Sequence, residues 1–298
     1  MPMKDKRVRR KVTLSEAMLK PEEEQRRLPV PTQKVRVAHI PLLSILSQRD
    51  REVEARREGL DAIHVTAALS GDFCGRREWI IRNYKTNAGT NTPFSSQRIV
   101  WALGRAAERH VRDSLLDSMR GNAVGVWSCV CGKKSRLGKF QQEDKCGTCQ
   151  SPLSIYGEHR AVSPSGNVSG SIDFLYQDEV EDYGVLEIKS IQKADYEKLT
   201  APLTSHRDQC NFYVHLLRLR GLRVARASVL YVAKDAVSGS PYKVYEIPLE
   251  IQPSVLQAHK DAEESFQEEI PAKRSGCGTP SSPIARKCSQ CAMCFSLE

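Results

Sequence analysis

The segment Tyr156–Ile191 places the strongest constraint on the fold, because its apolar and charged residues alternate as they do in β-strands. It reads YGEHRAVSPSGNVSGSIDFLYQDEVEDYGVLEIKSI, and the turn-like runs SPSGN and DEVEDYG divide it into a predicted β-hairpin followed by a third strand. Successive side chains of a strand point to opposite faces of its sheet. We therefore expect Ile172 and Phe174 to share one face and Asp173 to lie on the other.

The third strand carries an acidic and a basic residue in the spacing E-x-K. Glu187 and Lys189 are expected to share a face and to point away from the apolar residues beside them. Mg²⁺ prefers carboxylate oxygens, so Asp173 and Glu187 could supply two ligands to such an ion. Lys189 could orient a water molecule and offset negative charge on a phosphate. A solvated strand face would explain an isolated E-x-K equally well, because charged residues are mostly exposed.

Two strand motifs in this segment resemble the metal-binding strands of the PD-(D/E)xK nuclease superfamily. SGSIDFL with Asp173 is similar to the first of them, and LEIKS with Glu187 and Lys189 is similar to the second. Within the superfamily, the chain resembles the RecB-like exonuclease branch, to which the CRISPR-associated iron–sulfur exonucleases also belong. Together with two helical motifs, the resemblance extends over about Ile99–Leu217.

The two helical motifs flank the strands in the order that the family has. LGRAAERH carries Glu108, where the family has a helical acidic residue or histidine that assists the metal site, and His110 is a nearby alternative. HRDQCNFYVHLL carries Gln209 and Tyr213 in the branch's Q-x3-Y spacing. Residues four apart share one face of a helix, so this pair can act together. Ser205 precedes the motif and is expected to cap its helix.

The resemblance implies an α/β fold, a restriction-endonuclease-like core with a central mixed β-sheet flanked by helices. It implies a Mg²⁺- or Mn²⁺-dependent deoxyribonuclease, an exonuclease that hydrolyses phosphodiester bonds at DNA ends or on single strands. Metal binding falls to Glu108, Asp173 and Glu187, positioning and activation of water to Lys189, and a supporting role to the Q-x3-Y pair. Two alternatives remain: a structure- or sequence-specific endonuclease on the same core, and a nucleic-acid-binding protein without catalysis.

Eight of the ten cysteines fall into two groups, which in a chain without an export signal points to metal binding. The first group consists of Cys129, Cys131, Cys146 and Cys149 in the pattern C-x-C…C-x2-C. Four thiolates around a short loop fit a tetrahedral structural Zn²⁺ site. We therefore expect a zinc-ribbon-like insertion at residues 127–152, between a helix and the strands that follow it.

The second cysteine group lies at the C-terminus and could hold either an iron–sulfur cluster or zinc. Cys288, Cys291 and Cys294 form C-x2-C-x2-C, and Cys277 precedes them. The RecB-like resemblance favours a [4Fe–4S] cluster with Cys74 as the distant fourth ligand. Cys277 is the alternative fourth ligand, which would make the site a local C-terminal module and would favour zinc.

Charge and hydropathy bound the partners of the chain. A net charge of +9 over 298 residues and a pI near 9.0 raise the expectation of a polyanionic partner such as DNA. No apolar run reaches the length of a membrane span, and the basic N-terminus is not followed by the apolar segment of a signal peptide, so we expect a cytoplasmic protein. The resemblance allows partners in recombination, repair, phage replication or CRISPR adaptation.

The expected domain organisation has two parts. Residues 1–62 are rich in charge and poor in apolar periodicity, and we expect a flexible arm whose basic run KDKRVRRK is either solvated or in contact with phosphates. Residues 63–298 form the expected nuclease domain, in which the cysteine cluster of residues 275–298 pairs with Cys74.

Overall fold

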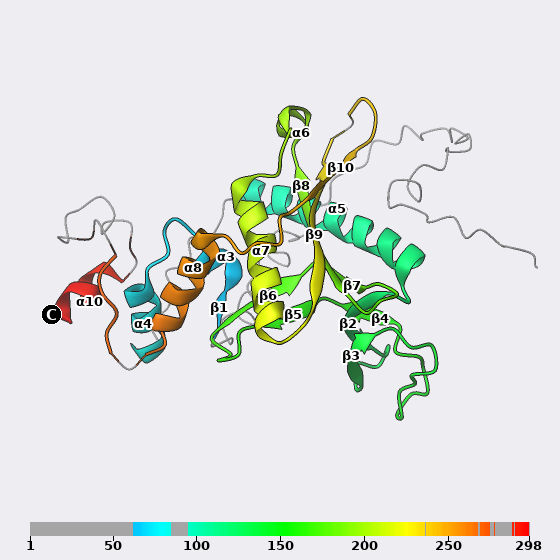
Figure 1. Ribbon diagram of the computed structural model, residues 1–298, viewed down its shortest axis with the longest axis horizontal. Coiled ribbons are helices and arrows are strands. Elements are labelled where there is room, and N and C mark those ends of the chain that lie inside the picture. Colours follow the sequence, from blue (N-terminus) through cyan, green and yellow to red (C-terminus); the bar gives the residue numbers. More distant parts are fainter. Residues whose placement is uncertain are drawn as a thin grey trace, which may run out of the picture. The chain divides into compact units, whose positions relative to one another are not determined.

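The computed structural model describes residues 62–84, 95–235, 237–267, 269–274, 277, 288 and 290–297, without the side chains of 95–98, 291 and 292. These residues all belong to the unit Leu60–Glu298, and the following description concerns that unit alone. The predicted charged arm lies outside the described residues except for its last position. Figure 1 shows the described elements in colour.

A seven-stranded mixed sheet forms the centre of this unit. Its strands follow the path β10-β9-β8-β7-β2-β3, and β4 also pairs with β2. The bounds are β2 Ala123–Ser128, β3 Ser135–Lys139, β4 Ile155–Gly157, β7 Phe174–Gln177, β8 Tyr183–Ile191, β9 Val224–Ala233 and β10 Tyr242–Glu246. The pair β8·β9 is parallel and the other pairs are antiparallel. Parallel pairing requires a crossover, and the chain between β8 and β9 supplies it with two helices.

A second, three-stranded sheet lies beside the first in the order β1-β6-β5. Its strands are β1 Ile63–His64, β5 His159–Val162 and β6 Val168–Ile172. The hairpin β5·β6 turns at SPSGN and the hairpin β7·β8 turns at the acidic run, where the sequence predicts turns.

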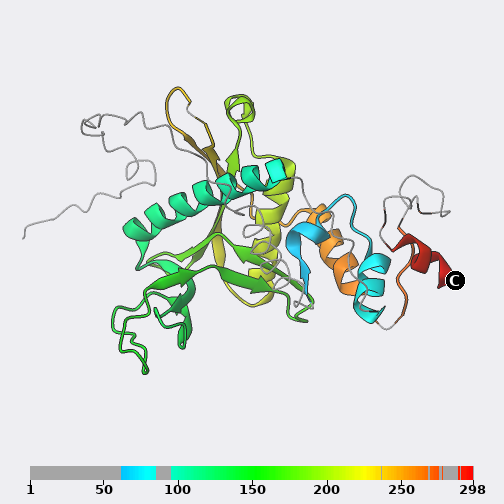
Figure 2. The same ribbon diagram turned by 180° about the vertical axis from the view of Figure 1, so that it is seen from behind.

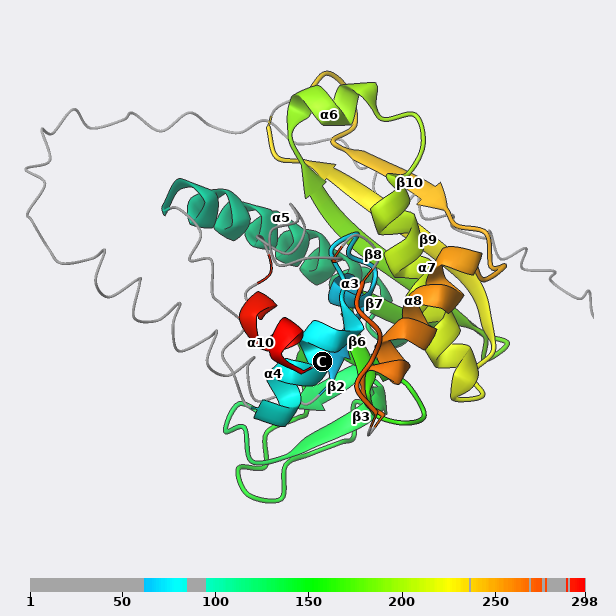
Figure 3. The same ribbon diagram turned by 90° about the vertical axis from the view of Figure 1, so that its left-hand side faces the viewer.

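Helices cover both faces of the central sheet, as Figure 3 shows for α5 and α7 on opposite sides of β8. The bounds are α3 Val65–Ala68, α4 Gly75–Tyr84, α5 Ser95–Met119, α6 Lys193–Lys198, α7 Thr204–Leu219, α8 Pro253–Glu264 and α10 Cys291–Ser296. The long helix α5 is seen from its exposed side in Figure 2. The predicted α/β architecture, a mixed sheet flanked by helices, is confirmed. Across the described residues, we find no helix with the combined length and apolarity that a membrane span needs.

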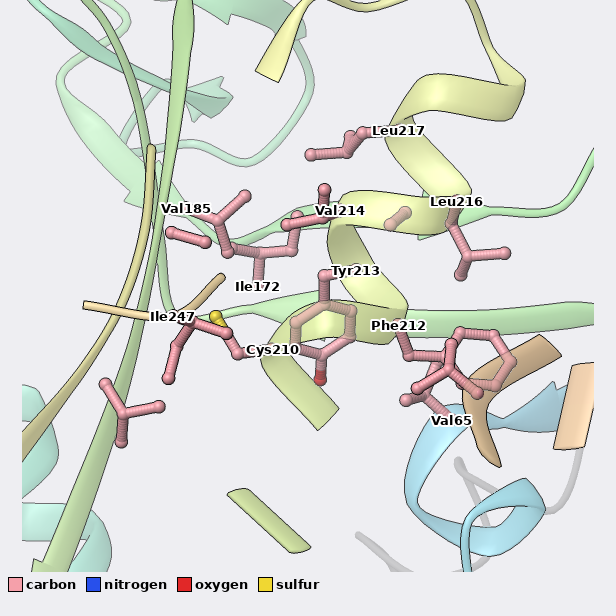
Figure 4. Packing of buried hydrophobic residues seen from close by; sticks show 14 of the residues in the cluster. Val65, Ile172, Val185, Cys210, Phe212, Tyr213, Val214, Leu216, Leu217 and Ile247 are labelled. Atoms are coloured by element: carbon pink, nitrogen blue, oxygen red, sulfur yellow. The ribbon is translucent and has the colours of Figure 1, made fainter. Parts of the chain in front are cut away.

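Two apolar cores hold the helices to the sheet, one on each face. In the α7-side core, Val185 of β8 packs with Phe212 and Val214 of α7; Figure 4 shows Tyr213 and Val214 turned toward the sheet. In the α5-side core, Leu186 and Ile188 of β8 pack with Val111 and Leu115 of α5, among others. Burying each such side chain contributes about 1.5–3 kcal/mol. Alternate side chains of β8 pack into the two cores, and a shift of one residue would exchange them. The register of β8 is therefore fixed.

The chain breaks its strand at Asp173, contrary to the sequence prediction. Ile172 ends β6 and packs in the α7-side core, whereas Phe174 begins β7 and packs in the α5-side core. The prediction that these two apolar residues share a face is therefore wrong. The reason is that the chain passes from the three-stranded sheet to the seven-stranded sheet at this point, and the alternation rule applies only within one continuous strand.

Candidate active site

Asp173 lies at the junction of the two sheets, where its carboxylate replaces a missing strand partner. The pairing of β7 with β8 ends at Phe174 and Leu186, so the Ile188 N–H beyond it has no backbone acceptor on that side. Asp173 Oδ2 accepts this N–H at 2.8 Å. The bond leaves the second carboxylate oxygen of Asp173 without a described hydrogen-bond partner and fixes the side chain beside β8.

Glu187 and Lys189 lie on the α7-facing side of β8 and pair with each other. Lys189 Nζ is 2.5 Å from Glu187 Oε1, with side-chain exposures of 22% and 2%. Glu187 Oε2 is buried and has no hydrogen-bond partner among the described residues. A buried carboxylate oxygen without a partner is costly, so this atom is suited to a ligand that the polypeptide does not supply.

Glu108 approaches the same strand from α5, which covers the opposite face, and its carboxylate lies at the strand edge that Asp173 also occupies. Its Oε1 accepts hydrogen bonds from Ser190 N at 3.2 Å and Ser190 Oγ at 3.0 Å. Gly104, one turn earlier in α5, allows the close approach, because a Cβ there would lie 2.8 Å from Ser190 Oγ. The charge of Glu108 acts on both Asp173 and Glu187, so the three carboxylates form one electrostatic cluster.

The Q-x3-Y pair packs behind this cluster on α7. Gln209 Nε2 donates to Tyr213 Oη at 2.9 Å, and both side chains are buried. The ring of Tyr213 lies so close to β6 that a Cβ on Gly170 would come within 2.6 Å of it. Burial, followed by the charge of Glu187, raises the pKa of Tyr213, which places the phenol near that carboxylate. The helix begins at Thr204 with Leu203 as its N-cap, so the expectation that Ser205 caps it is wrong.

The protonation of the cluster follows from its burial. Burial raises the pKa of Asp173 to about 6, against the opposing charge of Lys189. Burial and then the charge of Asp173 raise the pKa of Glu187 to about 8. Burial alone would lower the pKa of Lys189, but the charges of Glu187 and Asp173 outweigh it and raise that pKa. The lysine is therefore an ammonium at neutral pH, and its charge compensates the burial of the carboxyl groups only in part, since the pKa values of Asp173 and Glu187 stay raised.

Residues outside the four motifs complete the surroundings, and one of them, Glu158, is a candidate outer or substrate-side carboxylate from the sequence alone. Glu158 pairs with Arg112 of α5, and its charge also raises the pKa of Asp173. His206 and Tyr231 lie beside Lys189 and are joined by a hydrogen bond of 3.0 Å. Only the register of β8 with β9, which pairs Lys189 with Tyr231, brings this tyrosine to the site, and the sequence carries no signal for that register.

The first cysteine group comes together as the sequence predicts. The Sγ atoms of Cys129, Cys131, Cys146 and Cys149 all lie within 4.8 Å of one another. Cys131 Sγ is 3.2 Å from Cys129 Sγ and 3.7 Å from Cys146 Sγ. Tetrahedral thiolates with metal–sulfur bonds of about 2.3 Å are separated by about 3.8 Å. The four sulfur atoms are thus close enough to one another to hold a metal ion.

The second cysteine group is described only in part. Helix α10 packs against α4, and Arg76 Nη2 donates to the Cys294 carbonyl at 3.1 Å. The charges of Cys74 and Cys288 both act on the pKa of Cys294, which burial raises, so these three thiols lie near one another. The side chain of Cys291 lies outside the described residues.

Cys277, the alternative fourth ligand, is also close to this region. It is buried, and its backbone N–H donates to the carbonyl of Arg274 at 3.0 Å. Arg274 in turn pairs with Asp72, two residues before Cys74, at 3.3 Å. Both Cys74 and Cys277 thus remain candidates for the predicted fourth ligand.

Comparisons with known proteins give only distant likenesses. No protein-family model matches the chain, and no curated protein matches it. The solved structure of SSO0001 aligns with a TM-score of 0.40 and 13% identity, over 77% of this chain and 91% of that one. An alkaline exonuclease, LHK-Exo from Laribacter hongkongensis, aligns with a TM-score of 0.38 and 13% identity, over 70% and 87% of the two chains. Likenesses at this level carry no functional argument.

Proposed function

We propose that the chain is a metal-dependent nuclease whose active site consists of Glu108, Asp173, Glu187 and Lys189. One observation carries the proposal: Glu187 Oε2 is buried and has no hydrogen-bond partner among the described residues, although the carboxylates of Asp173 and Glu108 lie near it. Burial and mutual repulsion raise the pKa values of Asp173 and Glu187 in the metal-free protein, and a divalent cation would stabilise their deprotonated forms. The oxygen-only donor set fits Mg²⁺ or Mn²⁺.

Each residue has a distinct part in this proposal. Asp173 and Glu187 would hold the cation, which supplies charge neutralisation at the scissile phosphate when it is bound. Glu108 would add a third oxygen from α5 while its bonds to Ser190 fix its position. Lys189, as an ammonium, would hold the attacking water and offset phosphate charge by hydrogen bonding, and it would not accept a proton.

Within this class we propose an exonuclease that acts on DNA ends or single strands. Support comes from the Q-x3-Y pair, which the sequence shares with the RecB-like branch, and from its packing beside Glu187. The basic net charge of +9 suits a polyanionic substrate. A sequence- or structure-specific endonuclease remains the alternative outcome of the test below.

We further propose separate roles for the two cysteine groups. The group Cys129–Cys149 would hold a structural Zn²⁺, because four thiolates leave no open ligand position for catalysis. The C-terminal group with Cys74 would hold a [4Fe–4S] cluster, for which the packing of α10 on α4 brings the two ends of the domain together. Iron and zinc should be measured in wild type and Cys74→Ala purified without oxygen. Iron that is lost in Cys74→Ala would support the cluster, whereas a second zinc would support the alternative.

The test of the proposed function is cleavage of linear, closed circular and single-stranded DNA in Mg²⁺ or Mn²⁺. We expect cleavage of the linear and single-stranded substrates, with the closed circle spared. Asp173→Ala and Lys189→Ala should each lower the rate by about a hundredfold to a thousandfold while leaving the melting temperature within a few degrees. Nicking of the circle would point to the endonuclease alternative.

Glu264→Ala and Lys260→Ala are matched controls for charge removal. These residues form an exposed i,i+4 pair on α8 with an N–O distance of 3.7 Å, and such pairs contribute little to stability. Both controls should cleave like the wild type. Wild-type cleavage by purified Asp173→Ala or Lys189→Ala would remove the proposed mechanism. Tight DNA binding by the wild type without cleavage would favour the non-catalytic alternative.

A further inference from the structure

His206 occupies a position beside the candidate active site that no motif accounts for. It lies in the first turn of α7, and its Nδ1 is 3.0 Å from Tyr231 Oη. Tyr231 pairs with Lys189 in the parallel β8·β9 ladder, so the two side chains share the α7-facing side of the sheet. The charge of Lys189 also acts on His206, which confirms that the imidazole and the ammonium are close.

The hydrogen bonds of Tyr231 fix the tautomer of His206. Tyr231 is fully buried, and its Oη accepts the backbone N–H of Leu203 at 2.9 Å. Among the described residues, His206 Nδ1 is the other atom bonded to this hydroxyl and can receive its proton. A buried hydroxyl that failed to donate would be left unsatisfied, so Tyr231 donates to Nδ1. The proton of the neutral imidazole then resides on Nε2.

The Nε2–H group is consequently a donor held in a fixed direction. Within the described part of the chain, Nε2 makes no hydrogen bond and is not among the buried unpaired side-chain atoms, and His206 is half-buried. A donor beside a permanent ammonium favours an anionic acceptor. The first turn of α7 adds to this preference, because backbone N–H groups at a helix start attract anions.

We propose that His206 is a substrate-binding residue whose Nε2–H donates a hydrogen bond to a phosphate oxygen of the nucleic-acid strand, beside the phosphate held at Lys189. The inference rests on the proposed nuclease function and adds to it a contact with the strand. Tyr231 acts through His206 and is a positioning residue: its hydroxyl keeps the proton on Nε2. Phosphate contacts of this kind fix the register of a strand without reading its sequence.

The first test compares two replacements of His206 in the cleavage assay. His206→Phe keeps a ring in the same space but removes the donor, and we expect kcat/KM to fall by about tenfold to a hundredfold. His206→Gln restores an N–H donor and should recover most of that loss. Tyr231→Phe frees the imidazole and should cause a smaller loss, whereas Tyr245→Phe, on the neighbouring strand, removes a hydroxyl bonded to Leu199 O and should cleave normally.

The second test identifies the phosphate and does not depend on cleavage. In an Asp173→Asn background, binding is measured to single strands that carry one neutral methylphosphonate at successive positions. We expect the methylphosphonate at one position to weaken binding by the protein that retains His206. The same methylphosphonate should cause no further weakening in the His206→Phe variant. The melting temperatures of these variants should agree within a few degrees.

The outcomes separate this inference from the proposed function. If the wild type cleaves and His206→Phe matches it in kcat/KM and in the methylphosphonate profile, the inference is wrong and the nuclease proposal stands. If the wild type does not cleave, the nuclease proposal fails, and the binding profile alone decides whether His206 contacts a phosphate. Equal losses in His206→Phe and His206→Gln would indicate a packing role and overturn the inference.

Discussion

The carboxylate cluster and the four-cysteine group are both suited to a metal, but the protein holds them in different ways. Glu108, Asp173, Glu187 and Lys189 come from α5, the β6–β7 junction and β8, all anchored in the two large cores. The four cysteines lie within Cys129–Cys149, around the short strand β3. The first site is built from long-range contacts and the second from local ones.

The difference indicates what a metal would contribute at each place. The carboxylates are positioned by protein groups, because Ile188 N–H holds Asp173 and Ser190 holds Glu108. The cysteines contact one another and groups of their own loop, Lys134 for Cys129 and Ser151 for Cys149, and Cys131 is exposed. A metal would therefore supply chemistry at the first site and folding free energy at the second.

Removal of metal from the cysteine group should have the largest effect on stability. Structural zinc contributes about 10–16 kcal/mol in small modules, so Cys146→Ser should unfold the segment around residues 129–149. Limited proteolysis should then cut this segment rapidly. DNA cleavage should fall by less than about tenfold, because the carboxylates have their own anchors. Cys210→Ser, which alters a buried thiol outside the group, serves as the control for loss of a cysteine.

The carboxylate site should show a pH dependence that the cysteine group does not share. Folded Glu187 retains its proton up to a pKa of about 8, whereas the ordinary pKa of a glutamate in an unfolded chain is about 4.5. The folded state thus binds more protons between these values, and the metal-free protein should lose stability as pH rises from about 5 to 8. Each 1 kcal/mol lost corresponds to about 2–4 °C in melting temperature.

The same groups predict how the cation responds to pH. Only deprotonated Asp173 and Glu187 can bind it, so the apparent Mn²⁺ affinity should rise from pH 6 to pH 8 and then level. Addition of Mn²⁺ should raise the melting temperature more at pH 8 than at pH 5. In Glu187→Gln, the loss of stability between about pH 5 and 8 and the rise in melting temperature on adding Mn²⁺ should both largely disappear. A pH response equal to that of the wild type would contradict the assignment of this response to Glu187.

A smaller effect should follow from moving α5 away from β8. In Gly104→Val the new side chain would meet Ser190 Oγ, because the Cβ alone lies 2.8 Å from it. Glu108 would then lose its bonds to Ser190, and we expect the cleavage rate to fall by about tenfold. Gly121→Ala is the matched control, since an added Cβ there meets nothing within 4 Å. Equal rates for both variants would show that the position of Glu108 does not matter.

The sequence was sufficient for features that depend on local pattern. Alternation along LEIKS predicts that Glu187 and Lys189 share a face, and the i,i+4 spacing predicts that Gln209 meets Tyr213. The spacing of the first cysteine group predicts their convergence. These relations span few residues, so the geometry of one strand, helix or loop determines them.

Features that depend on distant elements could not be predicted in this way. The strand break at Asp173 arises because two sheets meet there, and no pattern within SGSIDFL marks a change of sheet. The contact of His206 with Tyr231 depends on the crossover from β8 to β9. Ser205 satisfies the rules for a cap, but the N-cap is Leu203, two residues earlier.

Binding of Mn²⁺ to the metal-free protein at pH 8, measured by calorimetry, tests the central claim most directly. Wild type and Cys146→Ser should both bind Mn²⁺ at the carboxylate site, while Asp173→Asn and Glu187→Gln should lose that binding. The four proteins should be compared at equal folded fraction, judged by circular dichroism. Retention of the wild-type affinity in both carboxylate variants would contradict the account.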